Sequence, residues 1–255
     1  MLIVLSPAKR LDFTEADPDL PASERRFLED TASLARTARG RTVAELRRLM
    51  GISDDLARLN RERFQAFDPE STDGVQAAFA FAGDVYEGLR ARELDTAGLA
   101  FAQDHVRILS GLYGLLRPLD RIQPYRLEMG TRLKTRRGAS LYDFWGDRIA
   151  KQLNADAEGQ GQRVLVNLAS QEYFGAVDAR ALKLPVVTPH FRETRDGESR
   201  IISFFAKKAR GGMTRFAIDE RIEKAEDLKA FDRDGYRFDK AASSETEWIF
   251  IRSGN

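Results

Sequence analysis

No helix of ordinary length can pass through residues 104–130. The apolar run Val106–Leu109 is followed by glycines at positions 111 and 114 and by prolines at 118 and 124. Glycine costs backbone entropy in a helix, and proline removes a donor and clashes with the preceding turn. We therefore predict a short strand followed by a backbone path that is specified residue by residue. The alternative is a strand followed by a surface loop with solvated charges.

The same segment contains four arginines. Arginine offers a planar fork of donors to phosphate, and glycine lets backbone N–H groups come close to an anion. We therefore predict anion contacts from Arg107, Gly111, Gly114, Arg117, Arg121 and Arg126. The tetrapeptide Gly111–Gly114 also resembles the glycine hairpin of helix-hairpin-helix DNA-binding proteins, although it has one residue more between its glycines.

Apolar runs at six places predict strands, and helical spacing fills the intervals between them. We expect one α/β (mixed α+β) domain, residues 1–255, because no linker or low-complexity tract divides the chain. A central mixed sheet flanked by helices should contain strands that start at Leu2, Arg107, Arg163, Val186 and Ile201. The last two strands would be Pro185–Phe191 and Arg200–Phe205, joined by a turn at 195–198, and Trp248–Ile251 would form a C-terminal strand.

Helix start signals occur in several places. Thr42 with Glu45 forms a capping-box pattern, Ser53 precedes two acids, and Ser140 with Asp143 opens another helical stretch. These signals predict helices within 22–67 and over 140–153, and a further helix over 96–105.

Polar residues follow two of the predicted strands. In open α/β sheets ligands bind beyond the carboxyl ends of strands, so Ser6, Lys9 and Arg10 are placed for phosphate contact. The alternative is a polar turn. Residues 167–174 form a second junction, where Ser170 is expected to cap a helix and Glu172 and Tyr173 could transfer protons.

A second basic segment lies at 206–215. It contains Lys207, Lys208 and Arg210 beside two glycines, and residues 200–215 include five basic residues and no acid. We predict a strand-to-helix turn that brings backbone and cations close to an anion.

The composition of the chain excludes several classes of functional site. The 41 basic and 40 acidic side chains leave almost no net field, so a nucleic-acid site must come from a local patch. The absence of cysteine excludes disulfides, thiolate nucleophiles and thiolate metal sites. His105 and His190 stand apart from paired carboxylates, and we expect neither a metal nor a cofactor. Lacking a long apolar segment and a leader sequence, the chain is expected to be cytoplasmic with no membrane contact.

The sequence also resembles a known protein family. Several blocks are similar to the YaaA family of peroxide-stress-resistance proteins: Ser6–Lys9, Phe81–Leu89, Ile108–Gly130, Asn167–Phe174 and Ile202–Arg215. Gln171 departs from the pattern, in which an acid is common. The resemblance implies a mixed α/β cytoplasmic protein that protects cells from hydrogen peroxide by limiting unincorporated iron. It also implies a positively charged cleft that binds double-stranded DNA with a helix-hairpin-helix-like element.

Three functions stay open. The leading hypothesis is a nucleic-acid-binding stress protein that contacts the DNA backbone through the cations and glycines listed above. The second is an enzyme acting on a nucleotide or nucleic acid base, with Lys207 or Lys208, Glu172 and Tyr173 as acid-base candidates. The third is direct iron binding by carboxylates, which no visible ligand spacing supports.

Overall fold

A mixed sheet of eight strands forms the centre of the molecule, as expected from the sequence. A computed structural model describes residues 1–14, 21–195 and 198–254. The strands are β1 (Leu2–Leu5), β5 (Val106–Ser110), β6 (Gly114–Leu116), β8 (Leu165–Leu168), β9 (Val186–Arg195), β10 (Glu198–Arg200), β11 (Arg237–Asp239) and β12 (Glu247–Ser253). Their order is β11-β12-β9-β8-β1-β5-β6, and β10 pairs with β9.

Strand β1 lies in the middle of this sheet because every one of its residues is apolar and can be buried. It runs parallel to β5 on one side, where Ile3 pairs with Val106, and to β8 on the other, where Leu2 pairs with Leu165. All four residues of β1 have no exposed surface. Parallel neighbours end at the same edge of a sheet, so the segments that follow β1 and β8 meet there.

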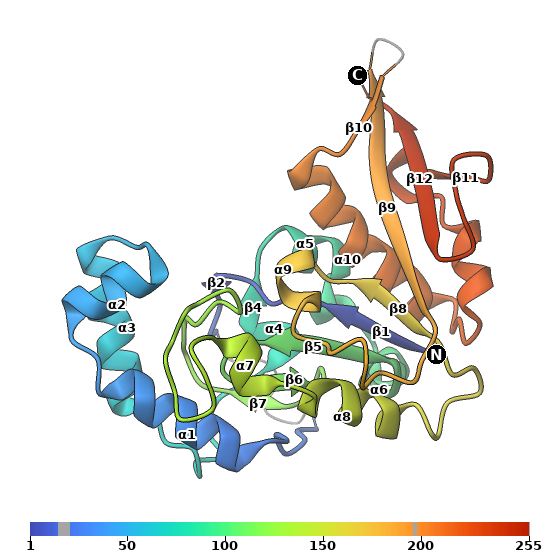
Figure 1. Ribbon diagram of the computed structural model, residues 1–255. Coiled ribbons are helices and arrows are strands. Elements are labelled where there is room, and N and C mark those ends of the chain that lie inside the picture. The colour runs from blue at the N-terminus through green and yellow to red at the C-terminus, as the bar shows by residue number, and fades with distance from the viewer. Residues whose placement is uncertain (15–20, 196–197, 255) are drawn as a thin grey trace.

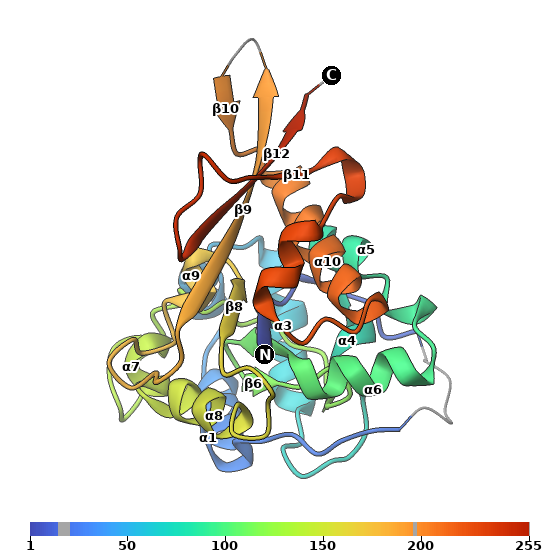
Figure 2. The ribbon, with the colours of Figure 1, turned by 90° about the vertical axis from the view of Figure 1, so that its right-hand side faces the viewer.

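Helices cover both faces of the sheet (Figures 1 and 2). In Figure 2, α6 and α10 lie on one side of β1 and β8, and α7 and α8 lie on the other. The helices of the body are α4 (Ala77–Ala80), α5 (Asp84–Leu89), α6 (Thr96–His105), α7 (Leu141–Trp145), α8 (Arg148–Asp156), α9 (Gln171–Phe174) and α10 (Ser203–Asp219). Three short 3-10 helices complete the set: η1 (Ala91–Glu93), η2 (Ala225–Ala230) and η3 (Arg233–Gly235).

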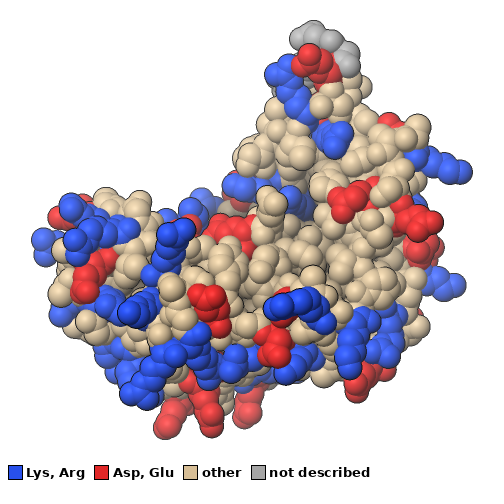
Figure 3. Space-filling view, in the orientation of Figure 1, with Lys and Arg blue, Asp and Glu red and all other residues tan. Residues whose placement is uncertain are grey.

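An arm of three helices projects from the body: α1 (Leu28–Arg39), α2 (Val43–Met50) and α3 (Asp54–Ala66) (Figure 1). Two small antiparallel ribbons lie in the body. Strand β2 (Arg10–Leu11) pairs with β4 (Phe81–Ala82), and β3 (Val75–Gln76) pairs with β7 (Arg121–Ile122). Strands β9, β10 and β12 stand above the body in Figure 1, and we call them the upright strands. A hollow lies between the arm and these upright strands, as Figure 3 shows.

The predicted helix starts are confirmed. Thr42 and Glu45 form the reciprocal capping box of α2, and Ser53 accepts a hydrogen bond from Leu56 N at the start of α3. Ser140 and Asp143 cap α7 in the same reciprocal way. The stretch 140–153, however, is two helices and not one, because Gly146 adopts φ 49° and ψ −123° between them.

The prediction of a strand over Arg200–Phe205 was wrong. The strand β10 ends at Arg200, and Ser203 begins α10, a helix of 17 residues. Local β-branched and aromatic residues favoured a strand, but the buried positions 206, 209, 213 and 217 repeat at helical spacing and pack α10 on the sheet. The predicted turn at 195–198 includes residues 196 and 197, which lie outside the described residues.

The segment 206–215 is consequently the interior of a helix and not a turn. One of its two glycines, Gly211, lies at the crossing of α10 over α5, where no side chain would fit. A Cβ at Gly211 would lie 1.7 Å from Val85 O, and a Cβ at Gly88 would lie 2.1 Å from Lys208 O. The expected use of Gly211 in anion contact is thus replaced by close helix packing.

Candidate functional site

The ends of β1 and β8 meet on the floor of the hollow, where α9 also lies (Figure 1). Ser6 follows β1 and Ser170 follows β8, and they bind each other: Ser170 N donates to Ser6 Oγ at 2.8 Å, and Ser6 Oγ donates to Ser170 Oγ at 3.2 Å. Ser170 Oγ also accepts from Tyr173 N, so it caps α9 as predicted. We expected the hydroxyl of Ser6 to face phosphate, but it links the segments that follow β1 and β8 through its hydrogen bonds to Ser170.

Lys9 and Arg10 lie on this floor with acidic partners. Lys9 Nζ lies 2.7 Å from Glu128, which also binds Arg126 at 2.9 Å, and Arg10 lies 3.4 Å from Glu87. Two cations share one carboxylate at Glu128. The floor therefore has a mixed charge and lacks the unopposed positive field that the sequence led us to expect.

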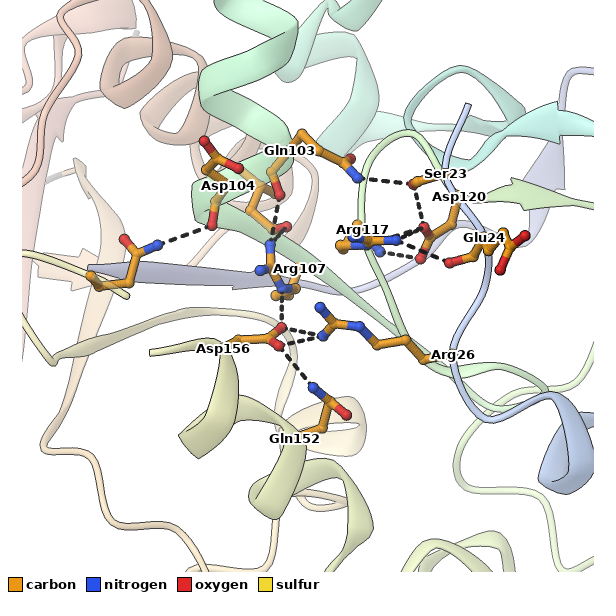
Figure 4. Close-up of polar contacts among 12 residues, drawn as sticks. Ser23, Glu24, Arg26, Gln103, Asp104, Arg107, Arg117, Asp120, Gln152 and Asp156 are labelled. Carbon is orange, nitrogen blue, oxygen red and sulfur yellow. Dashed lines mark hydrogen bonds and ion pairs between the residues drawn. The ribbon is translucent and has the colours of Figure 1, made fainter. Parts of the chain in front are cut away.

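Arg107 lies near the amino-terminal end of β5, and its almost fully buried side chain lines a polar cavity together with Arg26 and Arg117. It is 4 % exposed, and its Nε donates to Asp156 at 2.5 Å. Arg26 binds the same carboxylate, and Gln152 donates to it at 2.8 Å (Figure 4). Burial raises the pKa of Asp156, but the neighbouring Arg107 and Arg26 outweigh that effect and hold it below its usual range.

Gly111 and Gly114 form the tight turn of the hairpin between β5 and β6, so the expected helix-hairpin-helix is not found at these residues. Both glycines are buried. A Cβ at Gly111 would lie 2.2 Å from Leu127 O, and Gly114 has φ 71° under the ring of Trp145. Trp145 Nε1 donates to Gly111 O at 3.1 Å. These contacts explain the glycines by packing, and a phosphate could not reach them without moving the core.

The two other arginines of this segment are also partly inside. Arg117 pairs with Asp120 at 3.2 Å and donates to Glu24 O at 3.0 Å (Figure 4). Arg121 lies in β7, and its buried Nε has no hydrogen-bond partner among the described residues. Arg107 and Arg117 line one cavity, whereas Arg121 lies in β7 and Arg126 pairs with Glu128, so the four arginines do not form one surface.

The cations of α10 fall into two groups. Lys207 is exposed and lies 3.8 Å from Asp84. Lys208 and Arg210 are half-buried, and neither forms an ion pair within the described part of the chain. Burial lowers the pKa of the Arg210 guanidinium. These residues lie on α10, on the opposite side of the hollow from the arm.

The two acid-base candidates lie on α9. Glu172 Oε1 accepts a hydrogen bond from Gly130 N at 2.9 Å, and Tyr142 donates to the Glu172 carbonyl at 2.9 Å. Tyr173 is buried, and burial followed by the charges of Glu172 and Glu128 raises its pKa. Its hydroxyl is therefore protonated at neutral pH and can donate a hydrogen bond, while the raised pKa makes it a weaker proton donor.

The arm and the loop beside it contain cations that sequence reasoning missed. Arg132, Lys134 and Arg136 are exposed between β7 and α7, and none forms an ion pair in the described regions of the chain. Arg137 pairs with Asp30 and lies 4.6 Å above the ring of Phe144. The available signal was a run of four cations and no acid over residues 130–140.

The two helix starts at Thr42 and Ser53 were predicted, but not that α2 and α3 form a helical hairpin on the arm. Helix α2 ends at Gly51, which adopts φ 60° and ψ 42°, and α3 begins after Ser53. A Cβ at Gly51 would meet no atom within 4 Å, so this turn is open to solvent. The signal was a glycine at the end of the first helix, two residues before a serine that can cap the next.

Two structural absences hold for the described residues. None of the described helices combines the length and apolar character needed to cross a bilayer. No group of three or more His, Asp or Glu side chains in residues 1–14, 21–195 and 198–254 is arranged to hold a metal ion.

The fold and the site define an α/β protein with an open mixed sheet, a polar hollow at its strand ends and a helical arm. Comparison with known proteins identifies the family to which this α/β protein belongs. Residues 1–242 match the family model described as peroxide stress protein YaaA. The chain is 64 % identical over 252 residues to a UPF0246 protein of Phenylobacterium zucineum, covering 99 % of this chain and 95 % of that protein. A UPF0246 protein of Caulobacter vibrioides is 62 % identical, with 99 % of both chains covered. The chain belongs to the YaaA peroxide stress family.

Proposed function

We propose that this protein is a cytoplasmic member of the peroxide stress response that binds the backbone of double-stranded DNA and thereby limits oxidative damage and free iron. Membership of the peroxide stress family supports the cellular role. One structural observation carries the DNA proposal: the open hairpin between α2 and α3 lies on an arm whose neighbouring loop presents cations that form no ion pair among the described residues.

The start of α3 offers backbone donors to phosphate. The first N–H groups of a helix have no partner within the helix, and those of α3 follow the exposed turn Gly51–Ser53. Asp54 and Asp55 lie in the first turn of α3 and oppose phosphate there; the carboxylate of Asp54 is paired with Arg47 at 3.0 Å, and Asp55 forms no ion pair among the described residues. A pair of helices joined by an open glycine turn is thus the helix-hairpin-helix-like element we propose, in place of Gly111–Gly114.

The loop cations supply the charge. Arg132, Lys134 and Arg136 could contact phosphates next to the hairpin, whereas Lys207 and Lys208 could contact the duplex from the other side of the hollow. Aromatic residues near the central segment do not add base contacts, because Tyr113 and Tyr125 are buried. We therefore expect binding that depends little on sequence.

Salt dependence tests this proposal. If five or six phosphates are neutralised, the logarithm of affinity for duplex DNA falls with the logarithm of salt at a slope of about −5. The triple variant R132A/K134A/R136A should flatten that slope by about two to three units and lose peroxide protection in cells.

A matched control uses cations at the opposite edge of the sheet. Arg163 and Lys183 are exposed and precede the amino-terminal ends of β8 and β9, so R163A/K183A should leave the slope unchanged. Equal effects of the two variants would mean nonspecific attraction to the whole surface. Loss of DNA binding in the triple variant with protection intact would reject DNA as the functional ligand, and the acid-base pair Glu172 and Tyr173 would become the leading candidate.

A further inference from the structure

A basic cavity of about 550 Å³ lies between α2 and the loop that follows Gly130. Two leucines form part of its wall, and the other side chains that face it are charged. Its lining consists of Arg41, Glu45, Arg48, Leu49, Gly130, Arg132, Leu133 and Lys134. We call this cavity the arm pocket.

Charge in the arm pocket is strongly unbalanced. Four cations face a single carboxylate, Glu45. That carboxylate is already engaged, because it accepts hydrogen bonds from Thr42 N at 2.7 Å and Thr42 Oγ1 at 2.9 Å and pairs with Arg41 at 3.4 Å. Arg48, Arg132 and Lys134 form no ion pair within the described residues. The pocket therefore holds positive charge that a bound anion could neutralise.

One donor in the arm pocket is also unsatisfied. The Nε atom of Arg41 is buried and has no hydrogen-bond partner among the described residues. A buried donor without a partner destabilises the folded state relative to one that is hydrogen-bonded. The Arg41 guanidinium must turn before this atom can meet the pocket, and in that orientation an anionic oxygen could accept its hydrogen bond while neutralising the neighbouring cations.

We propose that the arm pocket binds a chain of linked phosphate groups, such as the polyphosphate tail of a nucleotide. Linked phosphates concentrate several negative charges in a small volume, which matches four cations converging on one cavity. The volume lies within the range of small-molecule sites, roughly 300–1,000 Å³. The inference does not require DNA binding, but the pocket adjoins the proposed DNA-binding hairpin, so an occupied pocket competes with duplex DNA.

Calorimetric titration of the full chain with inorganic phosphate, pyrophosphate and tripolyphosphate at constant ionic strength tests the proposal. Affinity should rise with each added phosphate. The variant R48A/K134A should weaken tripolyphosphate binding by about tenfold or more, since two charged donors to the phosphate chain are lost. The control R58A removes an exposed cation of the same arm that does not line the pocket, and it should bind as the unaltered protein does.

Two further measurements separate the possible outcomes. Adenosine triphosphate compared with tripolyphosphate shows whether a nucleoside adds affinity or the phosphate chain alone is recognised. Duplex DNA titrated in phosphate-free buffer tests the proposed function separately. Tripolyphosphate binding that is undetectable at millimolar concentration, or equal in R48A/K134A and R58A, overturns the pocket proposal whatever the DNA result.

Discussion

At the scale of single residues, the most consequential side chain outside the hollow is Asp156. Its carboxylate is almost fully buried and is held by Arg107, Arg26 and Gln152 (Figure 4). Arg107 also donates to the carbonyls of Gln103 and Val106 at 2.9 and 2.8 Å. This network joins α8 to β5 and to the segment before α1, so it stabilises three parts of the chain at once.

Replacing Asp156 by asparagine should destabilise the fold by about 3–5 kcal/mol, because Arg107 would be left as an uncompensated buried charge. The pKa of Asp156 lies below its unfolded value. The carboxylate therefore stabilises the native state above the unfolded pKa of about 4, and this contribution is lost as pH falls through the lower folded pKa. Urea denaturation at pH 7 and at decreasing pH measures both effects. The difference between the two proteins should shrink in acid.

The exposed pair Lys151–Asp147 on the neighbouring turn is the matched control, with side chains 68 % and 43 % exposed. D147N should change stability by less than about 1 kcal/mol. A similarly small effect of D156N would show that the buried network contributes little.

At the scale of elements, the crossing of α5 and α10 depends on adjacent glycines with different environments. A Cβ at Gly211 would lie 1.7 Å from Val85 O and 2.8 Å from Leu89 N. A Cβ at Gly212 would meet nothing closer than the ring of Phe231 at 3.7 Å, which is an ordinary contact. The two helices can therefore approach closely at one glycine, while the other has room for a side chain.

G211A should destabilise the protein by about 3 kcal/mol or more, because backbone atoms of α5 must move. G212A should be neutral or stabilising by up to about 1 kcal/mol, since alanine favours helix more than glycine does. Thermal and chemical denaturation of the two variants measure this contrast. Equal stabilities would mean that the crossing is looser than the distances indicate.

At the scale of the whole molecule, the sheet links segments that are far apart in the chain. Strand β1 pairs with β5 and β8, and β12 near the C-terminus pairs with β9. Because each strand depends on a distant neighbour, no half of the chain can complete the sheet alone. The upright strands and the sheet around β1 are joined through β9, which continues from one into the other.

We therefore predict one cooperative unfolding transition and no stable half-molecule in limited proteolysis. Circular dichroism and tryptophan fluorescence should give the same midpoint, because Trp145 and Trp248 lie in different regions of one folded unit. Two separated transitions, or a protected fragment that refolds on its own, would contradict this prediction.

The sequence alone determined the elements whose signals are local. The run Leu2–Leu5 specified a buried central strand, and the capping pairs at Thr42 and Ser140 specified helix starts, because a few adjacent residues contain the physical cause. Family membership was also visible in the sequence. These predictions needed no knowledge of what each segment packs against.

Tertiary structure decided the roles of glycines and charges. Gly111, Gly114 and Gly211 looked like anion contacts, yet each is where a backbone or ring from a distant segment leaves no room for a Cβ. Arg107 looked available for phosphate but is paired with Asp156, which lies 49 residues further along the chain. A glycine or an arginine has the same sequence signal in a binding loop and in a packed core. Only the long-range neighbour determines which of the two it serves.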